Sequence, residues 1–116
     1  MEAGLINLTQ NKAIAHDFKA CKSLISKARG LMFSKKRNLI FIFDKEKKIS
    51  LHMLFVFFPV WAVYLDKGKK AIYKKKLYPF ISCIRPEHKA KYILELVKNP
   101  AINEGDKISW QKQKLL

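Results

Sequence analysis

The chain has 116 residues, of which 49% are apolar and 28% charged, and its 24 Lys and Arg against 9 Asp and Glu give a formal net charge of +15. This length suits one domain with a single core and excludes two domains of ordinary size. The composition is that of a globular rather than a disordered protein. The basic excess favours polyanions such as nucleic acid or anionic lipid headgroups as partners, and it also keeps a protein in solution.

The N-terminal third predicts a hairpin, a helix and a strand, in that order. LINL and AIAHDFKA read as the two arms of the hairpin. In KSLISKARGLMF, apolar residues recur at the spacing of one helix face, which predicts an amphipathic helix near residues 22–32. The continuously apolar run 38–43 is typical of a short buried strand.

The run from Ile49 to Leu65 carries no formal charge and is at the lower length limit of a membrane-spanning helix. Its Phe, Val, Trp and Tyr content and its central Pro59 favour two strands instead, near 49–58 and 60–66. One face of the first strand would carry four apolar side chains: Leu51, Met53, Phe55 and Phe57. We therefore expect two core strands and no transmembrane segment.

Two further strands follow a turn at residues 66–68. The first is expected over 70–78. The second covers 91–97, where alternation places Tyr92 and its apolar partners inward and Glu95 outward.

The last elements complete the predicted domain, which spans residues 1–110 and is followed by a loose basic tail at 111–116. A short helical turn is predicted near 100–104, because Asn99 can cap it, Pro100 suits its first position and Gly105 can end it. A final strand is expected over 107–110. The fold class is therefore mainly β with a minor helical part, as a small sandwich or partly open barrel of about seven strands.

Residue patterns that carry chemistry are missing from this sequence. None of the three histidines has an Asp, Glu or Cys at metal-ligand spacing, and no nucleophile–base arrangement or glycine-rich phosphate loop is present. We therefore expect no catalytic residues, no metal and no cofactor, and we lean against an enzyme. Cys21 and Cys83 are far apart in sequence and do not have the spacing of a zinc or redox motif, which favours two free thiols in a reducing compartment. The start of the chain does not resemble a secretory signal, so we expect a cytoplasmic location.

Clusters of Lys and Arg provide candidate contacts to a polyanion. Solvated loops are the ordinary interpretation of such clusters, but hairpin loops at one end of a small barrel could also bring them together. Tyr73 and Tyr78 flank one cluster and are the aromatics best placed to stack on bases. The candidate polyanion-binding residues are Lys35, Lys36, Arg37, Lys67, Lys69, Lys70, Lys74, Lys75 and Lys76.

Four blocks resemble, in order and over nearly the whole chain, domain-of-unknown-function family 192, a group of small uncharacterised prokaryotic proteins. They are ARGLMF (28–33), YLDKGKKAI (64–72), AKYILEL (90–96) and INEGDKISW (102–110). The resemblance implies a small, mainly β fold and no established activity.

The chain departs from the family pattern in its central strand. Where the family usually has W-M-K-N-T, this sequence has HMLFV at 52–56, and Trp61 stands where the family has an Asp. If the family's polar groups form a ligand site, most of that site is absent here. The resemblance leaves His52 and Arg29 as the candidate ligand-binding residues, although Arg29 could equally have a structural role at a helix end.

Three hypotheses about function follow. The first is a non-enzymatic domain that binds a small ligand or a protein partner through loops on a β scaffold. The alternative is a basic nucleic-acid-associated protein that contacts the phosphate backbone through its Lys clusters. An enzyme is the third, and it has no chemical support in the sequence.

Overall fold

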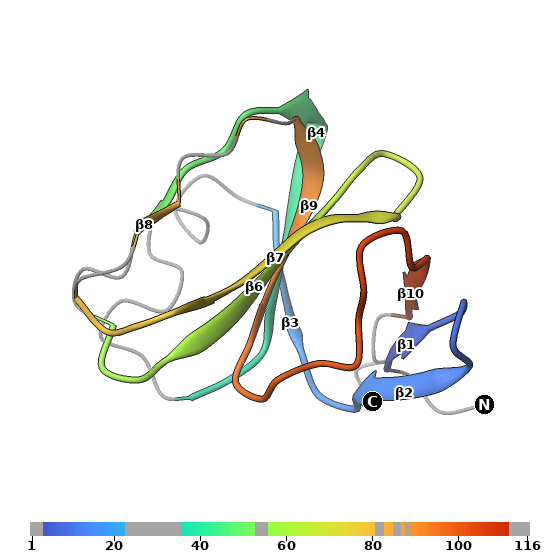
Figure 1. Ribbon diagram of the computed structural model, residues 1–116, viewed down its shortest axis with the longest axis horizontal. Coiled ribbons are helices and arrows are strands. Elements are labelled where there is room, and N and C mark those ends of the chain that lie inside the picture. Colours follow the sequence, from blue (N-terminus) through green and yellow to red (C-terminus); the bar gives the residue numbers. More distant parts are fainter. Residues whose placement is uncertain are drawn as a thin grey trace.

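The computed structural model describes residues 4–22, 36–52, 56–80, 83–84, 87 and 89–111, with the backbone alone at 51–52 and 83–84. Within these ranges every regular element is a strand, and the strands form three sheets (Figure 1). The mainly β fold is therefore confirmed. The helix expected near 22–32 lies, apart from Lys22, outside the described residues.

The main sheet contains five strands in the order β3-β4-β9-β6-β7. β3 runs parallel to β4, and all the other neighbours are antiparallel. Because β3 and β7 are the outer strands, the described part of this sheet does not close into a barrel. The bounds are β3 Lys19–Cys21, β4 Leu39–Lys47, β9 Ala90–Leu96, β6 Val60–Leu65 and β7 Ala71–Leu77.

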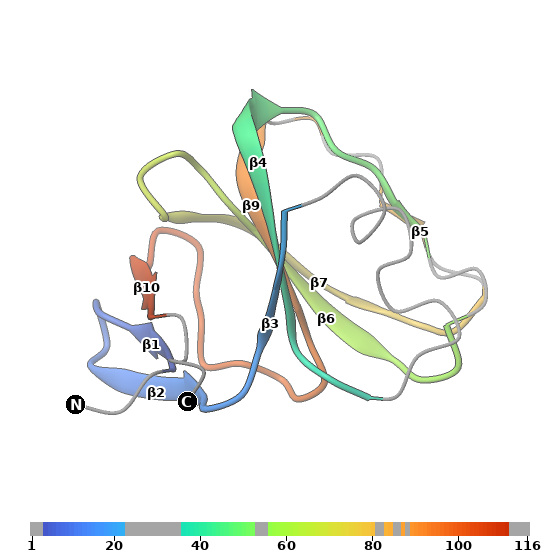
Figure 2. The ribbon, with the colours of Figure 1, turned by 180° about the vertical axis from the view of Figure 1, so that it is seen from behind.

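A small antiparallel sheet has the order β10-β1-β2 (Ile108–Trp110, Leu5–Asn7 and Lys12–Ala15). Its β1–β2 pair confirms the N-terminal hairpin. β5 (Leu51–His52) and β8 (Cys83–Ile84) form a separate antiparallel pair. Figures 1 and 2 show the small sheet on one side of the main sheet and the β5–β8 pair on the other.

Apolar residues cover the main sheet on both faces. Along β6, Val60, Ala62 and Tyr64 belong to one buried cluster, whereas Val63 and Leu65 belong to a second cluster that includes residues of the small sheet. Such two-sided burial explains why β6 is a continuous apolar run rather than an alternating one.

The same two-sided cover makes one prediction wrong. Glu95, expected to point into solvent, is only 5% exposed, because it lies in the central strand β9 between Leu39 of β4 and Ala62 of β6. Alternation along a strand indicates exposure only where one face of the sheet meets water. At the position of Glu95, both faces of the sheet are covered by other residues.

Two expected elements differ from the structure. The short helical turn near 100–104 is absent; the Asp106 amide instead donates to the Asn103 carbonyl, and Gly105 adopts a φ of 95° that closes a turn. The strand expected over 49–58 is a strand only at β5 within its described part, and residues 56–58 are irregular. Pro59 follows this irregular stretch, where no ladder hydrogen bond is needed from its nitrogen.

No helix that could cross a membrane occurs in the described ranges.

Candidate functional site

The two candidate ligand-binding residues from the sequence are only partly placed. Arg29 lies outside the described residues, as does Lys35. His52 is the last residue of β5, where its backbone pairs with Cys83. Their part in a site therefore stays a prediction.

The basic clusters do not meet in one place. Lys36 and Arg37 directly precede β4, and β4 begins beside the end of β9, since Leu39 pairs with Glu95. Lys67, Lys69 and Lys70 lie in the β6–β7 turn, at the opposite end of the main sheet, where Leu65 pairs with Tyr92 near the start of β9. The sheet separates these two groups along its strand direction.

The turn that carries Lys67, Lys69 and Lys70 is held in place. The Asp66 carboxylate accepts hydrogen bonds from the Gly68 and Lys70 amides, each at 2.9 Å. Lys69 adopts a φ of 64° and places its ammonium 4.3 Å from the centroid of the Trp110 ring. The positive charge of Lys69 therefore interacts with an aromatic ring of the protein itself.

The lysine run 74–76 divides between the two faces of β7. The Lys74 ammonium donates to the carbonyls of Pro100 and Ile102, at 2.8 and 3.3 Å, and burial lowers its pKa. The Lys76 ammonium lies over the Trp61 ring, 5.7 Å from its centroid. Lys75 points to the other face and is exposed.

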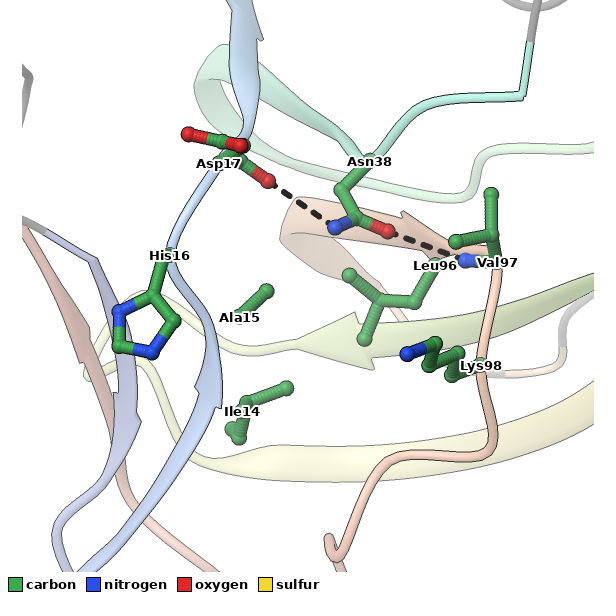
Figure 3. A pocket seen from close by; sticks show the side chains of 8 residues that line it. All are labelled: Ile14, Ala15, His16, Asp17, Asn38, Leu96, Val97 and Lys98. Carbon is green, nitrogen blue, oxygen red and sulfur yellow. Dashed lines mark hydrogen bonds between the residues drawn. The ribbon is translucent and has the colours of Figure 1, made fainter.

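A hollow of about 280 Å³, which we call the interlayer cleft, opens where the small sheet meets the end of β9 (Figure 3). One wall comes from β2 and the link to β3, and the other from the end of β9. In Figure 3 the Lys98 side chain extends toward Ala15, whereas the His16 ring lies on the far side of the β2–β3 link from Leu96. The lining residues are Ile14, Ala15, His16, Asp17, Asn38, Leu96, Val97 and Lys98.

Asn38 holds the two walls of the cleft together. Its Nδ2 donates to the Asp17 carbonyl at 2.9 Å, and its Oδ1 accepts from the Val97 amide at 3.0 Å (Figure 3). Its backbone carbonyl also accepts from the Lys19 amide. One side chain thus fixes three segments that are far apart in sequence, which gives the cleft a preformed shape.

A second hollow, of about 440 Å³, adjoins the cleft and shares Asp17, Asn38 and Val97 with it. It adds the basic side chains of Lys19, Lys36 and Arg37, together with Phe18. With Lys98, four cationic groups surround the two hollows against the single carboxylate of Asp17. The charge balance favours an anionic ligand.

The described acids do not form a catalytic pair. Burial raises the pKa of Glu95 to about 7, and no described residue donates a hydrogen bond to its carboxylate. Asp106 instead accepts hydrogen bonds from Asn7, Gln10 and the Asn103 amide, and these bonds lower its pKa. Among the described residues no group of His, Cys, Asp and Glu is placed to hold a metal ion.

The sequence patterns indicated Lys36 and Arg37 of the second hollow but none of the residues that line the interlayer cleft. Asn38 and Lys98 are 60 positions apart along the chain, so no local pattern links them. The one available signal was an Asn directly before a buried apolar strand, where a side-chain amide often satisfies backbone groups.

Curated relatives match the chain over nearly its full length. A UPF0127 protein of Pyrococcus furiosus is 29% identical over 115 residues, covering 93% of this chain and 98% of the relative. A UPF0127 protein of Pyrococcus horikoshii is 31% identical over 113 residues, covering 91% and 97%.

Two solved structures share the fold at low sequence identity. A protein of unknown function from Novosphingobium aromaticivorans superposes with a TM-score of 0.71 at 17% identity, covering 80% of this chain and 74% of that one. A protein from Sinorhizobium meliloti, suggested by its name to be a transcription regulator, gives 0.73 at 16% identity and covers 91% and 89%.

The profile of DUF192, a family described as Uncharacterized ACR, matches residues 6–110. This confirms the resemblance drawn from the four sequence blocks. The chain belongs to domain-of-unknown-function family 192, whose activity is not established.

Proposed function

We propose that this protein is a non-enzymatic binding domain whose interlayer cleft takes a small anionic ligand. The observation that carries the proposal is the pair of Asn38 side-chain hydrogen bonds, which we call the Asn38 clamp: it joins the β2–β3 link, the start of β4 and the end of β9 around a preformed hollow. Lys98 in the cleft and the three basic side chains of the adjoining hollow support an anion, and the apolar side chains of Ala15 and Leu96 support a ligand with a carbon skeleton. A cytoplasmic location is part of the same proposal, supported by the wide spacing of the two cysteines.

Inorganic phosphate and citrate are suitable first probes, since they separate a requirement for phosphate from one for carboxylate. In an amide NMR titration up to about 10 mM, where a millimolar site is largely filled, we expect localised shifts at Ala15, Val97 and Lys98. Replacing Lys98 by Ala should weaken binding roughly fivefold, the effect of losing one exposed charge contact.

Lys89→Ala is the matched control, because Lys89 is also exposed but precedes the start of β9, at the other end of the strand. It should leave the titration unchanged. Uniform small shifts over the whole surface, with no concentration at the cleft, would contradict a ligand site there.

A second candidate function is contact with nucleic acid phosphates through the lysine clusters. It is supported by the net charge of +15 and by the exposure of Lys36, Arg37 and Lys75. Duplex DNA, titrated at about 50 and about 200 mM salt, tests it, since affinity carried by phosphate contacts falls steeply as salt rises. Absence of binding at the lower salt concentration would exclude it.

A further inference from the structure

Three large aromatic side chains are exposed together at the open end of the β6–β7 pair. Phe57, Tyr78 and Phe80 are 59%, 51% and 48% exposed. We call these three residues the aromatic patch. The sequence pattern predicted that Phe57 lies on the apolar face of a core strand, and that prediction is wrong. Phe57 lies in the irregular segment before β6, and its side chain is exposed to solvent.

Strand pairing brings the two loops of the patch together. Val60, the first residue of β6, pairs with Leu77, the last residue of β7, so the segment before β6 and the segment after β7 leave from the same end. The rings of Phe57 and Phe80 then meet edge to face, with centroids 5.1 Å apart. Figures 1 and 2 show this end of β6 and β7 on the side of the molecule away from the small sheet.

Phe80 is held in an unfavourable backbone conformation. Its φ is 65°, in the left-handed region that bulky side chains rarely adopt. A residue under such strain that is also exposed gains little from burial, and strained residues of this kind cluster at ligand sites. The strain therefore points to a role for the Phe80 ring at the surface.

The surroundings of the patch are basic. The Lys76 ammonium lies 5.2 Å from the centroid of the Tyr78 ring, and Lys75 is exposed one residue earlier on β7. No acidic residue occurs between Lys67 and Pro86, nor between Lys47 and Leu65, the segments that supply the patch. An occupant should therefore combine negative charge with flat apolar groups.

We propose that the aromatic patch binds single-stranded nucleic acid, with bases stacked on Phe57 and Phe80 and a neighbouring phosphate contacted by Lys76. Aromatic side chains that can stack on bases, beside a basic side chain that can contact phosphates, are the combination found in sequence-tolerant single-strand sites. The inference rests on the second candidate function and names the place and the chemistry of contact. It is independent of the interlayer cleft, which involves β2, β3, β4 and β9.

A fluorescein-labelled oligo-dT of about twelve nucleotides is the probe, followed by anisotropy at low salt. We expect Phe57→Ala and Phe80→Ala each to weaken binding roughly tenfold, as the loss of one stacked base does. Lys76→Gln should lower the slope of log affinity against log salt by about one.

Two controls separate stacking from other causes. Leu8→Ala removes another exposed apolar side chain, 53% exposed in the small-sheet hairpin, and should leave affinity unchanged. Phe80→Asn places a residue that tolerates a positive φ at the strained position, so it preserves the loop while removing the ring. It should weaken binding as much as Phe80→Ala does.

The outcomes distinguish this inference from simple phosphate binding. Equal affinity for oligo-dT and for an abasic oligomer, or wild-type affinity in the Phe variants, would overturn base stacking even if duplex DNA still binds. Failure of both duplex and single strand would remove the second candidate function as well. Sedimentation with phosphatidylserine vesicles that depends on Phe57 and Phe80, without oligonucleotide binding, would assign the patch to a membrane surface and overturn the proposal.

Discussion

Glu95 and Asp106 are both buried acids, but they lie in opposite kinds of surroundings. Glu95 sits in the central strand of the main sheet, flanked by Leu39 and Ala62, and no described residue donates a hydrogen bond to it. Asp106 ties the β1–β2 hairpin to the loop before β10, since one of its oxygens accepts from the Asn7 and Gln10 side chains and the Asn103 amide at 2.7–2.8 Å. Burial raises the pKa of the first acid, and hydrogen bonds lower the pKa of the second.

Burial alone therefore does not decide whether an acid stabilises a fold. A buried carboxylate with several donors can be stabilising, because each donor replaces a water molecule. A buried carboxylate without donors is unfavourable as an ion and binds a proton instead. The two positions can be tested separately because they lie in different layers.

The largest effect is expected for Asp106→Ala. This change leaves the Asn103 amide without its acceptor and the buried Asn7 side-chain amide with the Ala101 carbonyl alone, and it loosens the turn that precedes β10. We expect a fall of roughly 15 °C in the thermal midpoint, measured by circular dichroism. Asp106→Asn keeps one acceptor oxygen and should lose less.

The Asp106 contribution should also depend on pH in one direction. Because its pKa in the folded protein lies below the usual 3.8, its stabilisation is present above that value and is lost as the pH falls through the lowered pKa. Stability measured against pH in wild type and in Asp106→Asn should converge in strong acid. Curves that stay parallel down to the most acidic point would contradict the hydrogen-bonded carboxylate.

Glu95→Gln should have the opposite sign. The pKa of Glu95 rises from 4.5 to about 7, so the unfolded chain loses its proton first and the folded state becomes less stable as the pH rises from about 4.5 to about 7. Removing the charge should therefore raise the free energy of unfolding at pH 8 by up to about 3 kcal/mol and flatten this pH dependence.

Urea denaturation across this pH range measures the effect, with Glu104→Gln as the control, because Glu104 is exposed. Lower stability of Glu95→Gln at pH 8 would show that the carboxylate has a favourable partner after all.

A smaller effect is expected for Lys74→Met. Its ammonium donates to the carbonyls of Pro100 and Ile102, in the same loop that ends at Asp106. Met keeps the apolar stem and loses these hydrogen bonds, so we expect a loss of about 1 kcal/mol in urea denaturation. Lys75→Met, on the exposed face of β7, is the matched control and should be neutral.

Sequence patterns predicted the elements whose burial is local. β6 and β4 were found because continuous apolar runs are typical of strands covered on both faces. β3 was missed because three residues, Lys19–Cys21, carry no periodicity, and the parallel partner that defines the strand lies 20 positions away. The Glu95 prediction was wrong because alternation cannot reveal that both faces are covered.

The candidate site was less predictable than the fold. The Asn38 clamp and the Asp106 network both join segments distant in sequence, and their members are ordinary polar residues that would suit any loop. Only Lys36 and Arg37 were found in advance, through charge. The exposure of Phe57 was missed because an apolar run gives no sign of where its strand stops.

The pairing of β1 with β10 has a consequence for how the protein is made. Residues 5–7 are synthesised about a hundred residues before their partners at 108–110. Until then β1 and β2 form an isolated hairpin, and a two-stranded hairpin is marginally stable in water. The central strand β9 of the main sheet is also synthesised late, so the two sheets can pack together only when nearly all of residues 5–110 have been made. Contacts of such long sequence separation also form slowly, so we expect closure of the small sheet to be a late step in folding.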